Sequence, residues 1–131
     1  MKIEIKNKFT GNVIFSYNAE NNSISRTVKA ALKQKINLSN ADLYSANLSN
    51  ADLSDANFRW CVGDGKIILS MQVTQWGIAF TKTHLAIRCK QYSIEEWRNF
   101  NDDEISKMNY GALEWWKKWK DFIFQAIELS K

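Results

Sequence analysis

The sequence predicts a mainly β fold with α-helical caps, built as a single domain around a short solenoid. The first observation is a five-residue repeat over 36–60, a period that neither a helix nor a strand explains. The second is the alternation of apolar and polar residues on both sides of this repeat, which is typical of strands. The third is a tryptophan-rich stretch with helical periodicity near the C-terminus. The 131 residues fit one domain, because domains commonly have about 100–150 residues.

Residues 1–35 predict a hairpin followed by a helix, which together cap one end of the solenoid. Apolar and polar residues alternate within 1–22 on both sides of a Thr-Gly-Asn turn. Residues 23–35 instead place apolar side chains at helical spacing. Ser23 or Asn22 can cap this helix, and lysines in its last turn favour its C-terminal end.

Residues 36–60 read INLSN ADLYS ANLSN ADLSD ANFRW. Each unit has a central Leu, or Phe in the last unit, that follows Asn or Asp. Five residues advance a helix by about 500°, so successive units would slip by about 140°. In a strand, an odd spacing changes the face at every unit. A chain that turns a corner every five residues keeps the central side chains on one side: Leu38, Leu43, Leu48, Leu53 and Phe58.

This segment resembles the A(D/N)LXX motif of pentapeptide-repeat proteins. Their fold is a right-handed quadrilateral β-helix, in which each repeat forms one side of a square coil. The resemblance implies that the central Leu and the preceding Ala point into the coil. Because four repeats complete a turn, it also implies that Leu38 stacks near Phe58 and Ile36 near Ala56.

Residues 61–92 follow the repeat and are expected to help close its core. One coil cannot bury itself, because solenoids need about three stacked units and capped ends. The segment holds three short apolar runs, around 67–71, 76–80 and 85–89. These runs predict three short strands, which either continue the solenoid as irregular coils or form a small sheet on its open end.

Residues 93–131 predict a helical cap at the other end. Ser93 followed by Glu96 is the pattern of a capping box at a helix start. The longest helix is expected over 110–130, because apolar residues recur there at helical spacing. Four of them share one face: Trp116, Trp119, Ile123 and Ile127.

The tryptophans of this long helix allow two interpretations. In the first, Trp116 and Trp119 close the open coil and Trp115 is left near the boundary. In the second, Trp115, Trp116 and Trp119 form a self-association or partner surface, with Tyr44 as a further candidate. Tryptophan is enriched at the centres of interfaces, so the second interpretation includes a homo-oligomer.

The sequence offers little for catalysis or metal binding. His84 is the single histidine, and Cys61 and Cys89 are the two cysteines. Their spacing matches no zinc-site pattern, and no glycine-rich phosphate loop is present. We therefore expect no enzyme activity, no metal and no cofactor, and we expect both thiols to be reduced.

A small-molecule site is the alternative to a protein-binding surface. A pocket between the strand region and the long helix would let the protein sequester a nucleotide-type ligand. The candidate ligand contacts are Trp76, His84, Arg88 and Lys90, of which the last three would form a cationic side.

Charge and hydropathy narrow the classes of partner. A transmembrane helix needs about 18 consecutive apolar residues, and no such run occurs, so no membrane association is expected. The N-terminus alternates charged and apolar residues, unlike a signal peptide, which points to the cytoplasm. The net charge of +4 is spread along the chain, so nucleic acid is not an expected partner.

The whole chain also resembles small pentapeptide-repeat proteins of bacteriophages and prophages, through NKFTG at 7–11 and its Trp-rich C-terminal helix. The resemblance implies an accessory protein of the host cytoplasm that binds a host protein, with inhibition of an antiviral defence as one role. Some longer pentapeptide-repeat proteins mimic DNA and bind type II topoisomerases. This role is not favoured here, because a single coil with only Asp42, Asp52 and Asp55 departs from that pattern.

Overall fold

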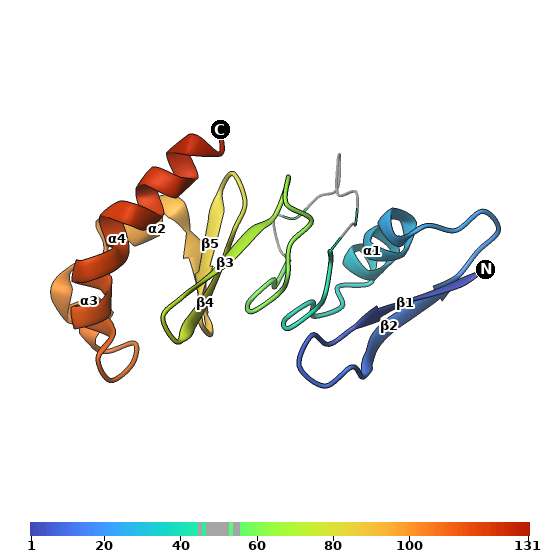
Figure 1. Cartoon of the computed structure of the whole chain (residues 1–131), viewed down its shortest axis with the longest axis horizontal. Coiled ribbons are helices and arrows are strands. Elements are labelled where there is room, and N and C mark those ends of the chain that lie inside the picture. Colours follow the sequence, from blue (N-terminus) through green and yellow to red (C-terminus); the bar gives the residue numbers. More distant parts are fainter. Residues whose placement is uncertain (45, 47–52, 54–55) are drawn as a thin grey trace.

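A computed structural model describes residues 1–44, 46, 53 and 56–131. Its elements form layers along the long axis of the molecule (Figure 1). A hairpin and helix α1 lie at the N-terminal end, and the coil of the repeat segment comes next. A four-stranded sheet follows, and three helices form the C-terminal end.

The N-terminal layer is the predicted hairpin with its helix. Strands β1 (Lys2–Lys6) and β2 (Val13–Asn18) pair antiparallel. Helix α1 (Ile24–Lys33) begins after Ser23, whose side chain accepts a hydrogen bond from the backbone N–H of Arg26. The helix packs its buried side against the hairpin.

The described residues of the repeat segment, here called the coil, include two stretches of chain that hydrogen-bond to each other. Asp42 and Val62 form a parallel bridge, twenty residues apart. The N–H of Leu38 donates to the carbonyl of Asn57 at 3.1 Å, one residue before Phe58. Leu38 and Phe58 are fully buried in one hydrophobic cluster.

The Asn or Asp of each described unit shapes a corner of the coil. The side-chain oxygens of Asn37, Asp42 and Asn57 accept hydrogen bonds from the backbone N–H two residues later. Asn40 and Trp60 have φ values of 66° and 62°, which suits the third position of a type II turn. The predictions for Leu48, Asp52 and Asp55 lie outside the described residues.

The segment after the coil forms a small sheet on the coil's open end, which settles the alternative left by the sequence. Four strands run antiparallel in chain order, one more than the apolar runs predict. They are β3 (Leu69–Val73), β4 (Trp76–Phe80), β5 (His84–Ile87) and β6 (Lys90–Ser93).

One cross-strand row of this sheet faces the coil. It consists of Ser70, Ala79, Ala86 and Gln91, each directly opposite the next. Ala79 and Ala86 are buried with the coil residues. Gln91 donates its side-chain N–H to the carbonyl of Ala56 at 2.6 Å, and its side-chain oxygen accepts the N–H of Phe58 at 3.0 Å.

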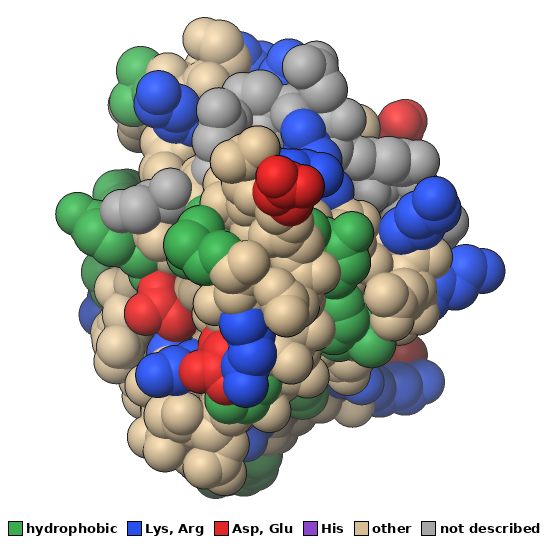
Figure 2. Space-filling model, turned by 90° about the vertical axis from the view of Figure 1, so that its right-hand side faces the viewer, with side chains coloured by type: hydrophobic (Ala, Val, Ile, Leu, Met, Phe, Trp, Pro, Cys, Tyr) green, Lys and Arg blue, Asp and Glu red, His purple; other side chains and the backbone are tan. Residues whose placement is uncertain are grey.

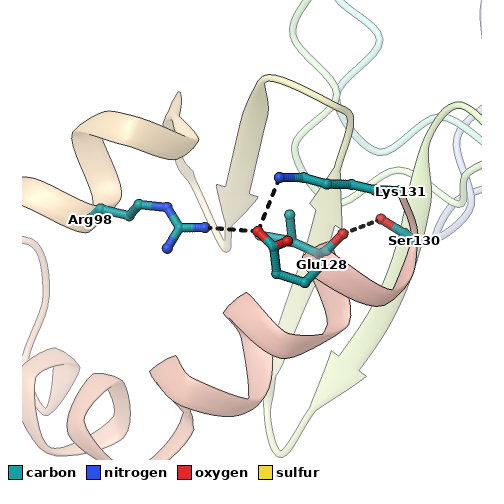
Figure 3. Close-up of polar contacts among 5 residues, drawn as sticks. Arg98, Glu128, Ser130 and Lys131 are labelled. Atoms are coloured by element: carbon teal, nitrogen blue, oxygen red, sulfur yellow. Dashed lines mark hydrogen bonds and ion pairs between the residues drawn. The ribbon is translucent and has the colours of Figure 1, made fainter.

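The helices cover the opposite face of the sheet. They are α2 (Ile94–Asn99), α3 (Asp102–Ser106) and α4 (Ala112–Leu129). Ser93 and Glu96 form the predicted capping box at the start of α2. At the far end of α4, the Glu128 carboxylate contacts Arg98 of α2 at 3.4 Å and Lys131 at 3.0 Å (Figure 3).

Two expectations about this layer were wrong. The long helix does not close the coil, because the sheet stands between them and has an apolar face on each side. Trp115 is not at a boundary: it is 8% exposed, and its ring N–H donates to the Thr74 hydroxyl, whereas Trp119 is partly exposed. In the part of the chain that the structure describes, more residues lie in helices than in strands.

Candidate functional site

A groove of about 480 Å³ opens between the hairpin loop, the coil and the first two strands of the sheet. Each of the three contributes a different kind of surface. The loop contributes a lysine and a phenylalanine, the coil a tryptophan, and strand β3 a row of polar side chains. The main lining residues are Lys8, Phe9, Trp60, Ser70, Met71 and Gln72.

The aromatic wall of the groove is held by the fold on both sides. The rings of Phe9 and Trp60 meet nearly edge to face, with centroids 6.1 Å apart. Trp60 lies over Gly77 of β4, where a Cβ would come within 2.7 Å of the Trp60 ring. Phe9 is 66% exposed although it sits beside another ring. A large apolar side chain is therefore presented to solvent from a fixed position.

The hairpin loop is anchored at the base of this wall. The side-chain oxygen of Asn7 accepts the backbone N–H groups of Phe9 and Thr10. The backbone N–H of Lys8 donates to the carbonyl of Asn40 in the coil at 2.8 Å. These bonds fix the loop to the coil and so fix the direction in which Phe9 and Lys8 project.

Lys8 supplies a cation at the edge of the aromatic wall. Its Nζ lies 4.8 Å from the centroid of the Phe9 ring and 5.6 Å from that of Trp60, within the range of cation–π contact. Partial burial lowers the pKa of Lys8 below its ordinary value. Within the described ranges, no Asp or Glu lies at ion-pair distance from its ammonium.

Cys61 also lines the groove, but its thiol is not reactive at neutral pH. It is 2% exposed, and burial raises the pKa of its thiol to about 12. The thiol therefore stays protonated at neutral pH, and a protonated thiol is a poor nucleophile. Cys89, in contrast, is exposed between β5 and β6.

The predicted small-molecule contacts come together only in part. Trp76, Arg88 and Lys90 line a cavity of about 30 Å³ between the sheet and the helices. His84 is not in its lining, and its ring pairs with the Thr83 hydroxyl at 2.8 Å. The cavity has room for about one water, whereas sites for small organic ligands are commonly about 300–1,000 Å³.

The predicted partner surface is divided between core and exterior. Trp115 and Trp116 are buried, where their rings pack at a tilt against those of Trp76 and Trp97, with centroids 4.7 and 5.3 Å apart. Trp119 is partly exposed beside Phe122, which is 48% exposed. Tyr44 is 73% exposed but belongs to the coil, a different layer of the molecule. The structure therefore does not bring these four candidates into one surface.

Charged side chains do not organise a site of their own. On the N-terminal face of the molecule, Lys and Arg are spread among Asp and Glu and do not gather into a stripe (Figure 2). No three His, Cys, Asp or Glu side chains lie close enough to hold a metal in the part of the chain described. Among the same residues, none of the helices is both long and apolar enough to cross a membrane.

Two residues of the sequence could have indicated the groove, although neither belongs to a functional motif. Phe9 is a large apolar residue directly before the predicted Thr-Gly-Asn turn, where burial is not expected. Trp60 is a large side chain at an outward position of the last repeat. Neither residue shows that it faces the other, because the loop and the coil meet only in the folded chain.

Comparisons with known proteins locate the repeat and nothing else. Residues 34–61 match the family model described as pentapeptide repeats (8 copies), about a fifth of the chain. This match confirms the five-residue repeat predicted for 36–60. No curated protein and no solved structure matches the chain.

Proposed function

We propose that this chain is a binding protein without enzymatic activity, and that it holds a segment of another protein in the groove. The observation that carries the proposal is the exposed Phe9 ring, fixed against Trp60 and beside the Lys8 ammonium. Aromatic anchors near the centre of a concave surface supply much of the affinity of protein interfaces. The lysine would add preference for a partner that carries a negative charge.

The shape of the groove favours a chain segment over a small molecule. The groove is lined by three separate parts of the chain, and its aromatic edge at Phe9 is exposed to solvent. The cavity beside Trp76, where the sequence predicted a nucleotide-type ligand, has only about 30 Å³ and is too small for one. A peptide needs no enclosed cavity, because it takes its affinity from side-chain anchors and main-chain hydrogen bonds.

The proposal includes a fold and a setting for this site. We propose that the repeat segment is a short right-handed quadrilateral β-helix, which the twenty-residue spacing of the Asp42–Val62 bridge supports. The resemblance to small phage proteins favours a host protein as the partner and the host cytoplasm as the place. Inhibition of an antiviral defence is the role that we propose for such a complex.

Selection from a random library of linear peptides tests the groove. The library is selected on the wild-type protein, and the enriched peptides are then measured on Phe9→Ala. We expect this variant to lose about tenfold or more in affinity, because it removes an anchor from the groove. Tyr44→Ala is the matched control, since Tyr44 is an exposed aromatic residue outside the groove.

Two results would count against the proposal. The library yields no peptide that binds the wild-type protein, or the enriched peptides bind Phe9→Ala as tightly as the wild type. Because Phe9 is 66% exposed, its truncation is not expected to unfold the protein. A circular dichroism spectrum of each variant verifies this.

A further inference from the structure

Strand β3 has a free edge, and its residues border the groove. The sheet order is β3-β4-β5-β6, so β3 pairs on one side only among the described residues. Ser70, Met71 and Gln72 of this strand line the groove. Ser70 and Gln72 are exposed. An unpaired strand edge is a template for pairing with another chain.

The hydrogen bonds of the sheet show which backbone groups point to the free edge. The carbonyl of Gly77 in β4 accepts the N–H of Arg88 at 2.9 Å, so the polar backbone groups of Gly77 point toward β5. Gln72 lies directly opposite Gly77. In an antiparallel ladder, when the N–H and C=O of one residue point away from its partner, those of the partner also point away from it. The N–H and C=O of Gln72 therefore point outward.

Ser70 points the same way as Gln72, because backbone groups alternate along a strand. The free edge of β3 thus offers two N–H and two C=O groups to an added strand. Across the groove stand the Phe9 and Trp60 rings and the ammonium of Lys8. A strand laid along β3 would place alternate side chains toward that wall, because side chains alternate with a period of two.

We propose that the groove takes an extended peptide segment that adds to the sheet as a new strand beside β3. Its backbone pairs with Ser70 and Gln72, one apolar side chain packs on Phe9 and Trp60, and an acidic side chain meets Lys8. This inference rests on the proposed function and specifies the conformation and charge of the partner. Strand addition at a sheet edge is a common way for proteins to bind peptides.

The test uses the peptides that the linear library yields and methylates their backbone nitrogens one at a time. In an added strand only alternate N–H groups face β3, so methylation at those positions removes a hydrogen bond and introduces a clash. We expect affinity to fall about tenfold or more at alternate positions and to change less than about threefold at the positions between.

A variant of the protein tests the same edge from the other side. Gln72→Pro removes the outward N–H without breaking the β3–β4 hydrogen bonds, and proline is tolerated at such edge positions. We expect it to weaken peptide binding about tenfold or more. Gln72→Val also removes the amide side chain but keeps the backbone donor, so the difference in affinity between Gln72→Pro and Gln72→Val isolates the backbone N–H. Equal affinities for the two variants would overturn strand pairing at this edge.

The charge requirement is tested by changing both partners. Lys8→Gln should weaken the binding of an acidic peptide but not the binding of its Glu→Gln analogue. When both changes are made, the loss of affinity should be smaller than the sum of the two single losses. A binding peptide without an acidic residue that is insensitive to Lys8→Gln would overturn this part.

The outcomes separate the two proposals. Peptides that lose affinity on Phe9→Ala but not on alternate methylation or Gln72→Pro overturn strand addition and leave the groove as a binding site. Peptides that bind Phe9→Ala as tightly as the wild type overturn both the groove as a binding site and strand addition. A wild-type dimer that becomes monomeric in Gln72→Pro would show that β3 pairs with a second copy, which also overturns the peptide proposal.

Discussion

At the scale of single residues, Cys61 and Lys8 show how the same groove changes two ionisable groups. Burial disfavours the charged form of each, so it raises the pKa of the Cys61 thiol and lowers that of the Lys8 amine. Each group also opposes the shift of the other, because a thiolate and an ammonium attract. The larger effect of burial keeps the thiol neutral.

The Cys61 thiol should make the stability of the protein depend on alkaline pH. In the unfolded chain the thiol loses its proton near its ordinary pKa of 9.0, whereas the folded protein keeps that proton until about pH 12. Above pH 9 the unfolded state therefore binds fewer protons, and the free energy of unfolding falls as pH rises. The slope from this group is at most ~1.4 kcal/mol per pH unit.

Urea unfolding between pH 8 and about pH 10.5 measures this slope. Lysines and tyrosines also titrate in this range, so the informative quantity is the difference between the wild type and Cys61→Ala. The variant loses a constant amount of packing energy but should show the shallower slope. Equal slopes for the two proteins would contradict the pH effect assigned to this thiol.

Individual residues also show where the sequence could not predict the site. His84, Arg88 and Lys90 are close in sequence, but only Arg88 and Lys90 line the cavity beside Trp76. Arg88 has a φ of 55° in the turn between β5 and β6, so the chain reverses there. A tight turn at a non-glycine residue has no strong sequence signal, and it decides which side chains share a face.

At the scale of elements, the repeat could be predicted because its period is unusual. A five-residue spacing excludes regular helix and strand, and the family match covers the same segment. Strand β6 could not be predicted in the same way. Its residues, KQYS, are all half-buried and do not alternate between apolar and polar. An edge strand of this kind gives no periodic signal.

The layer order could not be read from periodicity, because both the strands and the long helix have apolar faces. The deciding feature is residue size on one face of β4 and β5. Gly77, Ala79 and Ala86 are small enough for the coil and Trp60 to approach the sheet closely. The larger side chains of the same strands face the helices. Size, not hydrophobicity alone, therefore places the sheet between coil and helices.

The contact between coil and sheet depends on Gln91, which binds two backbone groups of the coil. Gln91→Leu keeps the size of the side chain but leaves the Ala56 carbonyl and the Phe58 N–H without their partner. We expect the free energy of unfolding to fall by about 1–3 kcal/mol. Urea unfolding followed by tryptophan fluorescence measures the loss.

Gln125→Leu serves as the control for this change. It makes the same substitution at an exposed position on α4 and should alter stability by less than about 0.5 kcal/mol. If both variants lose the same stability, the Gln91 bonds contribute nothing specific to the contact between the layers.

At the scale of the whole molecule, the sheet links two hydrophobic clusters, one on each of its faces. One cluster contains the coil, α1 and the small residues Ala79 and Ala86. The other contains the helices and the large residues of the same strands, Ile78 and Leu85 among them. Because adjacent residues of β4 and β5 serve both clusters, loss of either cluster removes support from one face of the sheet.

This arrangement predicts that the coil and the helices unfold together. Ile123 of α4 is fully buried in the helix cluster, and Ile123→Ala should cost about 2–5 kcal/mol. Native-state hydrogen exchange measures how this loss is distributed. The N–H of Leu43 in the coil, which bonds to Val62, should lose as much protection as the amides in the middle of α4.

Phe122→Ala on the exposed side of the same helix is the control and should change protection little at either place. A coil that keeps full protection in Ile123→Ala while α4 loses it would show two independently unfolding units. The aromatic wall of the groove would then survive the loss of the helices, because neither Phe9 nor Trp60 packs in the helix cluster. Cooperative unfolding instead makes the binding groove depend on helix packing at the far end of the molecule, so Ile123→Ala should weaken peptide binding only where it populates the unfolded state.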